Sequence, residues 1–122
     1  MKLGTRPFII VVITGIAMLA VGLQAQEPIT LFTGRQHIST EWELCVQARQ
    51  AVHATELLFF AFENATDWIL SIDGQEVKTF TGYPYYAYSG SLEPGTHLVK
   101  IAVKQPATLL FMRGYEGVEL CP

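Results

Sequence analysis

Charged residues are scarce in this 122-residue chain, making up 16% of it against about a quarter in an ordinary soluble domain. Basic residues are the rarer sign, with eight Lys and Arg against eleven Asp and Glu, so the formal net charge is −3. Surfaces that bind nucleic acid need clustered Lys and Arg, and the acidic balance therefore argues against such a partner. Half of the residues are hydrophobic, which excludes a disordered chain.

Histidine, serine and cysteine lack the spacings that metal binding or nucleophilic catalysis requires. His37, His53 and His97 stand far apart, and no two of them are four residues apart as on one face of a metal-binding helix. Ser89 and Ser91 flank a glycine but form no nucleophile elbow. The two cysteines form no C-x-x-C pair. We therefore predict that the protein is not an enzyme and holds no metal and no cofactor.

The hydrophobic excess is concentrated at the N-terminus. Residues 1–25 contain Lys2 and Arg6 but no acid, and an apolar run of 17 residues covers positions 7–23. A positive start, an apolar stretch and a small residue at its end are typical of a cleaved secretory signal. The run is also close to the roughly 20 residues of a membrane-spanning helix, so an uncleaved membrane anchor is the alternative.

Both interpretations place residues 26–122 outside the cytoplasm, because the positive end of the segment stays inside. This part is predicted to be one exported domain, periplasmic or secreted, or facing the periplasm from an inner-membrane anchor. It holds all eleven acids and six of the basic residues, so its net charge is −5. Cys45 and Cys121 both lie in it, and two cysteines of a small exported domain are most simply one disulfide.

Alternating apolar and polar residues predict strands in the exported part. Positions 42–48 alternate in this way, which is typical of a half-buried strand. Asp73-Gly74 between two apolar runs is a strong hairpin signal, and Pro94-Gly95 and Asn64–Asp67 indicate further turns. Short strands and frequent turn signals predict a mainly β fold, a small β-sandwich of six to eight strands.

A helix at about 41–56 is the alternative. Thr40 and Glu43 have the spacing of a helix capping box, and the residues that follow are rich in Glu, Gln, Ala, Arg and Leu. Such a helix makes the fold α+β.

Residues 68–116 contain a sequence of motifs that resembles a known family. A strand ends in Ile72-Asp73-Gly74, a second strand follows, and Leu92-Glu93-Pro94-Gly95-Thr96-His97 leads into a Val-containing strand. This order is similar to the PEGA domain, a small bacterial cell-envelope β-module, although Gly114-Tyr115 lies later than the Gly-Tyr of that family. The resemblance implies a non-catalytic envelope module and carries over no catalytic residue.

Four tyrosines, Tyr83, Tyr85, Tyr86 and Tyr88, fall within six residues in a setting of Gly, Pro and Ser. One interpretation is that residues 82–91 form a loop that presents these rings to a sugar or a protein. The alternative is a strand in which Tyr86 and Tyr88 point one way, Tyr83 and Tyr85 point the other way, and one pair packs in the core.

The sequence thus predicts a non-catalytic exported β-sandwich that binds a protein or a glycan in the cell envelope. Membrane is a partner only if the N-terminal helix is retained. One alternative is a membrane-anchored accessory subunit of a larger envelope complex. Another is a small inhibitor or immunity protein that acts against an extracellular enzyme.

Overall fold

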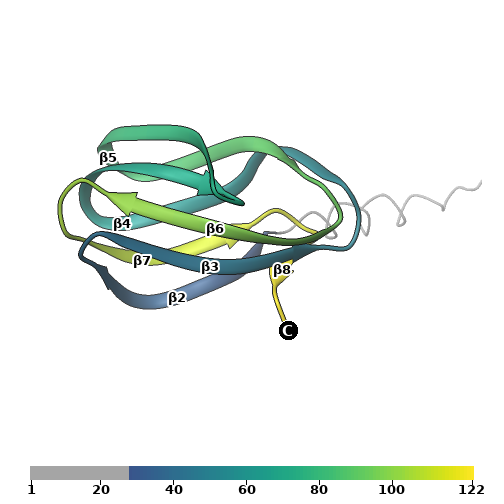
Figure 1. Cartoon of the computed structure of the whole chain (residues 1–122). Coiled ribbons are helices and arrows are strands. Elements are labelled where there is room, and N and C mark those ends of the chain that lie inside the picture. The colour runs from purple at the N-terminus through teal and green to yellow at the C-terminus, as the bar shows by residue number, and fades with distance from the viewer. Residues whose placement is uncertain (1–27) are drawn as a thin grey trace, which may run out of the picture.

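The computed structural model describes residues 28–122, which form seven strands and, within that range, no helix (Figure 1). The mainly β prediction and the expected number of strands are confirmed. The signal or anchor predicted for residues 1–25 lies outside the described residues. No helix in residues 28–122 has the length and apolar character needed to cross a bilayer. The strands are β2 (Ile29–Ile38), β3 (Glu41–Ala48), β4 (Val52–Ile72), β5 (Gln75–Leu92), β6 (Gly95–Val103), β7 (Ala107–Gly114) and β8 (Val118–Leu120).

The long strand β4 belongs to both layers of the structure. Its residues 58–62 pair with β7, its residues 68–72 pair with β6, and β5 runs antiparallel beside it along most of its length. One layer therefore has the order β2-β7-β4-β5, and the other has the order β5-β4-β6-β3-β8, so that β5 also contributes to both (Figure 1). The two layers enclose one core.

Residues 62–66 are the place where β4 passes from one layer to the other. The register with β5 shifts between Ala61 and Thr66, and residues 63–65 are exposed there. Extra residues in one strand bend it and increase its twist, which is what the change of layer requires. The turn predicted at Asn64–Asp67 is therefore wrong, because these residues are an irregular part of one continuous strand.

The alternative helix at 41–56 is also wrong. Residues 41–48 form β3, which pairs with β6 along its whole length and with β8 at its end, and β4 begins at Val52. Val46 and Ala48 are buried and Trp42 and Leu44 are half-buried, as the alternation of apolar residues predicts. The period-two pattern, which fits a strand covered on one face, outweighs the local capping signal.

Trp68 lies at the centre of the core, where the two layers meet. Its ring centroid is 4.8–5.9 Å from those of Phe60, Phe62, Phe80 and Tyr86. Phe60 and Phe62 precede the bend in β4 and Trp68 follows it, so this cluster joins the two layers. The indole N–H finds no hydrogen-bond acceptor in residues 28–122, so ring packing alone fixes the side chain.

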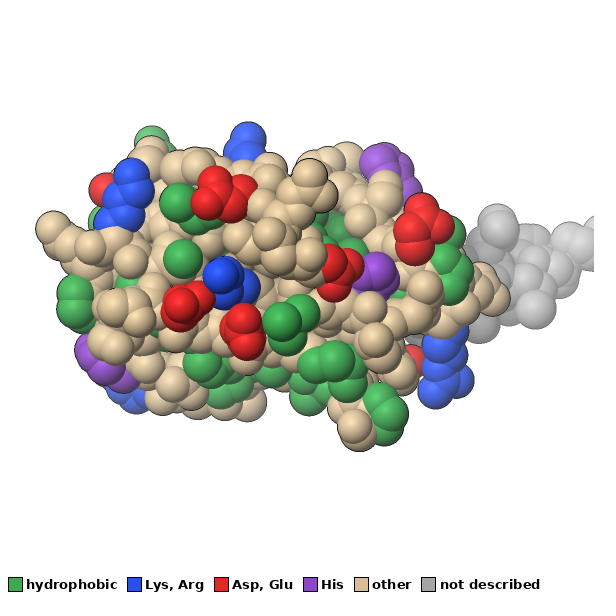
Figure 2. All heavy atoms as spheres, in the orientation of Figure 1, with side chains coloured by type: hydrophobic (Ala, Val, Ile, Leu, Met, Phe, Trp, Pro, Cys, Tyr) green, Lys and Arg blue, Asp and Glu red, His purple; other side chains and the backbone are tan. Residues whose placement is uncertain are grey.

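Cys45 and Cys121 form a disulfide with their Cα atoms 5.5 Å apart. The N–H of Cys121 also donates a hydrogen bond of 3.2 Å to the carbonyl of Cys45. The C-terminal residues are thus attached to β3. Figure 2 shows apolar side chains gathered along the lower edge of this face and charges of both signs elsewhere. Leu98 and Leu120 are among the exposed large hydrophobic residues.

Candidate functional site

The four tyrosines lie on strand β5, so the loop predicted at 82–91 is wrong and the alternating strand is confirmed. Tyr83 and Tyr85 are 68% and 62% exposed, whereas Tyr86 is buried and Tyr88 is half-buried. Pro84 is accepted in this strand because β5 pairs with β4 alone and the register shifts at this point, between Tyr83 and Tyr85. The strand therefore displays two rings and buries a third.

The buried hydroxyl of Tyr86 fixes the backbone beneath the exposed pair. It accepts a hydrogen bond of 2.6 Å from the N–H of Tyr83 and donates one of 2.8 Å to the carbonyl of Thr66. One residue earlier, the N–H of Gly82 donates to Oδ1 of Asp67 at 2.9 Å, and Gly82 has a φ of +84° that bends the strand. Two side-chain hydrogen bonds thus hold the segment that presents Tyr83.

Gly90 provides the space that the ring of Tyr88 occupies. A Cβ at position 90 would lie 2.6–2.7 Å from three atoms of the Tyr88 ring and hydroxyl. Any larger residue at this position therefore displaces the tyrosine. The glycine of Ser89-Gly90-Ser91 serves packing within a strand, not the flexibility of a loop.

Tyr85 belongs to a larger outward surface on the layer of β5, β4 and β7. Ala61 of β4 pairs with Tyr85 on one side and with Phe111 of β7 on the other. Phe59 and Arg113 form the adjacent pair, two residues along each strand. Residues two apart in a strand share a face, so these five side chains lie together. We call this set the aromatic face.

The guanidinium of Arg113 lies over two rings of the aromatic face. Its central carbon is 4.9 Å from the centroid of Phe59 and 5.0 Å from that of Phe111, and the two rings are 5.9 Å apart. The Nε atom is buried and finds no hydrogen-bond partner among residues 28–122. A cavity of about 260 Å³ adjoins the guanidinium and is lined by Pro28, Glu56, Phe59, Arg113, Gly114 and Tyr115.

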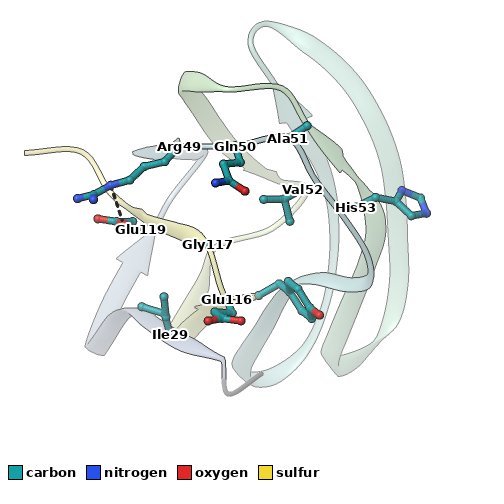
Figure 3. A pocket seen from close by; sticks show the side chains of 10 residues that line it. Ile29, Arg49, Gln50, Ala51, Val52, His53, Glu116, Gly117 and Glu119 are labelled. Atoms are coloured by element: carbon teal, nitrogen blue, oxygen red, sulfur yellow. Dashed lines mark ion pairs between the residues drawn. The ribbon is translucent and has the colours of Figure 1, made fainter. Parts of the chain in front are cut away.

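A second, larger cavity lies at the end of the sandwich, between the β3–β4 connection and the β7–β8 connection (Figure 3). It has a volume of about 610 Å³ and is bordered by Ile29, residues 49–53, residues 115–117 and Glu119. Arg49 Nε and Glu119 Oε2 are 3.4 Å apart at its rim, and Figure 3 shows His53 pointing away from it. The polar side chains here are at the mouth of an open pocket.

The three histidines are not brought together, and residues 28–122 contain no group of three His, Cys, Asp or Glu side chains arranged to hold a metal. His53 Nδ1 is 2.6 Å from Oγ of Ser91, its in-register neighbour on β5. His97 Nδ1 is 2.7 Å from Oδ2 of Asp73. The hydrogen bond to Asp73, followed by one to the carbonyl of Glu93, raises the pKa of His97.

No family model matches the sequence, and no curated protein matches it either. A solved structure described as a family 35 carbohydrate binding module from an environmental isolate is similar, with a TM-score of 0.58. The match covers 79% of this chain and 91% of that chain, at 14% sequence identity. At this identity the similarity shows a common fold.

Proposed function

We propose that the domain is a non-catalytic exported module that binds a glycan through Tyr83 and the aromatic face. The observation that carries this proposal is the exposure of Tyr83 and Tyr85 on an ordered strand. Most aromatic rings in residues 28–122 lie in the core or pack against it, and exposing two neighbouring ones forgoes the stabilisation that their burial provides. A binding role accounts for that cost.

The chemistry of the two rings favours a sugar. Tyrosine offers a flat apolar face together with a polar hydroxyl, and a sugar ring likewise combines an apolar C–H face with hydroxyl groups. The backbone of Tyr83 is already fixed by the Tyr86 hydroxyl. A fixed surface loses little conformational entropy when it binds, which favours affinity for a small flat ligand.

Two further observations support the proposal. The fold is similar to that of a carbohydrate binding module, which agrees with a role in glycan recognition. The disulfide between Cys45 and Cys121 suits an oxidising compartment, periplasmic or extracellular, where envelope glycans are found. Membership of the PEGA family stays a proposal that rests on the motifs of residues 68–116.

The test is recovery of the partner from the native envelope fraction with the tagged, disulfide-bonded protein. We expect wild type to retain glycan, and the Tyr83→Ser/Tyr85→Ser double variant to lose it. Val77→Ser is the matched control, because Val77 is also an exposed apolar residue of β5. Glycan retention should be unchanged in that control.

The same experiment separates the other candidate functions. Recovery of a stoichiometric protein in place of glycan would support the accessory-subunit or inhibitor alternatives and overturn the proposal. Loss of activity of a co-purified hydrolase would identify the inhibitor among them. Equal glycan recovery by wild type and the double variant would reject the tyrosines as the binding surface.

A further inference from the structure

We propose that Arg113 forms a subsite for an anionic group of the bound glycan: a carboxylate, a sulfate ester or a phosphate ester. This inference deepens the proposed function, on which it rests, by naming the class of glycan. It is drawn from the surroundings of the guanidinium, which differ from those of the other arginines in residues 28–122.

Within residues 28–122, the charge of Arg113 has no acidic partner. In residues 28–122, each of the other arginines lies within 4 Å of a carboxylate: Arg35 with Glu63, and Arg49 with Glu119. No acidic oxygen within this range lies that close to Arg113. A guanidinium is always protonated in proteins, so Arg113 carries a positive charge that no carboxylate of residues 28–122 pairs with directly.

The guanidinium is also held in place before any ligand arrives. Phe59 and Phe111 lie under it at 4.9 and 5.0 Å, and such cation–π contacts restrict both the position and the plane of the group. Because Nε is buried, contact with a ligand falls to the two terminal nitrogens. A planar pair of donors matches the oxygens of a carboxylate, sulfate or phosphate group.

The adjoining cavity gives such a group a place to bind. Its volume of about 260 Å³ is suited to part of a sugar residue, and it is open beside Arg113. Glu56 also lines it, beyond ion-pairing distance of Arg113, and can accept a hydrogen bond from a sugar hydroxyl. The cavity therefore combines one cation, one acceptor and an aromatic wall at Phe59 and Tyr115.

The subsite is close enough to Tyr85 for one oligosaccharide to contact both. Arg113 is on β7 and Tyr85 is on β5, with β4 between them. Two strand spacings across the sheet and two residues along it amount to about 12 Å, a distance that a short glycan spans. The ring of Tyr85 binds the face of one sugar, and Arg113 selects for an anionic group on the same sugar or on a neighbouring one.

The test uses nuclear magnetic resonance of the full exported protein, following the Nε–H of Arg113 and the amide of Gly114. The probes are D-glucuronate, glucose 6-sulfate, glucose 6-phosphate and the neutral methyl glucoside. We expect a saturable shift with at least one of the three anions and none with the neutral glucoside. The anion that binds most tightly identifies the chemistry. The Nε–H of Arg49, which is already paired with Glu119, is the internal control.

Absence of a saturable shift with all three anions would overturn the inference, as would an equal shift with the neutral glucoside. Arg113→Met removes the charge, and Arg113→Lys keeps it without the planar pair of donors. We expect at least tenfold weaker anion binding in the first variant and an intermediate loss in the second. Unchanged binding in Arg113→Met would contradict the assignment.

The outcome is separable from that of the proposed function. Tyr83→Ser/Tyr85→Ser leaves Arg113 and both of its phenylalanines in place, so anion binding at Arg113 should persist in that variant. If the double variant recovers as much glycan as wild type while the anions still cause a saturable shift at Arg113, the proposed function fails and the anion subsite is supported. If the double variant loses glycan recovery and Arg113 binds no anion, the proposed function is supported and the anion subsite is rejected.

Discussion

Asp73 in the β4–β5 turn and His97 on β6 are joined by a contact of 2.7 Å between Oδ2 and Nδ1. The other ring nitrogen of His97, Nε2, lies 2.7 Å from the carbonyl oxygen of Glu93. Both nitrogens face acceptors, so both must donate, and the imidazolium is the form that satisfies them. Asp73 in turn accepts the N–H of Leu98 at 2.9 Å through its second oxygen. The β4–β5 turn is thereby attached to the start of β6.

The first prediction concerns the dependence of stability on pH. The hydrogen bond to Asp73 raises the pKa of His97 above 6.5, so its stabilising contribution is complete below pH 6.5 and is lost as pH rises through the raised value. The pKa of Asp73 is lowered from 3.8, chiefly by the hydrogen bond to His97 and then by that to the Leu98 N–H. The contribution of Asp73 is therefore present above pH 3.8 and is lost as pH falls through the lowered value.

We expect the free energy of unfolding to fall by about 0.5–1 kcal/mol between pH 6 and pH 9, the range of a partly exposed ion pair. His97→Gln should remove this decrease, as measured by urea unfolding at both pH values. Asp73→Asn is the matched variant, because asparagine also tolerates the φ of +54° found at this position. A decrease of the same size in both variants would show that another group is responsible.

The second prediction concerns the hydroxyl of Tyr86. Tyr86→Phe keeps the ring in the core but leaves the N–H of Tyr83 and the carbonyl of Thr66 without that partner. We expect a loss of about 1–3 kcal/mol in the free energy of unfolding, measured with urea. Tyr88→Phe is the control, since residues 28–122 provide no hydrogen bond to its hydroxyl, and it should change stability by about 0.5 kcal/mol or less. Equal losses in the two variants would contradict the role assigned to Tyr86.

The third prediction concerns the disulfide. Cys45 and Cys121 are 76 positions apart, and closing a loop of that length corresponds to about 4.5 kcal/mol of chain entropy in the unfolded state. Cys45→Ser/Cys121→Ser should lower the urea midpoint accordingly, with this figure as the upper limit. The same midpoint in the oxidised and the reduced wild-type protein would show that the bond adds no stability.

Short-range patterns in the sequence predicted the regular parts of the fold. The alternation of residues 42–48 identified β3, and Asp73-Gly74 identified the β4–β5 hairpin. Asp73 and Gly74 have φ values of +54° and +83°, which is the positive pair that such a two-residue turn requires. In both cases the residues that form the sequence pattern also adopt the predicted conformation, a half-buried strand in one case and a two-residue turn in the other.

The continuity of the two long strands was harder to predict, because β-bulges and turns favour the same residue types, such as glycine and asparagine. Residues 64–67 were interpreted as a turn and residues 82–91 as a loop, but β4 and β5 continue through them. Gly34, with a φ of +119°, lies within β2 in the same way. Only the pairing partners on either side decide whether such a residue bends a strand or ends it.

The candidate site was predictable only in part. The alternation along β5 correctly separated Tyr83 and Tyr85 from Tyr86, since residue spacing alone determines which face each occupies. The position of Arg113 over Phe59 and Phe111 was missed. It depends on the β4–β7 register, which joins segments that are far apart in the sequence and leaves no local pattern.

The most direct test of the central claim is the affinity of the protein for envelope polysaccharides, measured by affinity electrophoresis at equal protein concentration. We predict that wild type and Val77→Ser are retarded by the same polysaccharide. Tyr83→Ser/Tyr85→Ser should bind it at least tenfold more weakly, a difference of about 1.4 kcal/mol. A double variant that keeps its urea midpoint and is retarded as strongly as wild type would contradict the account.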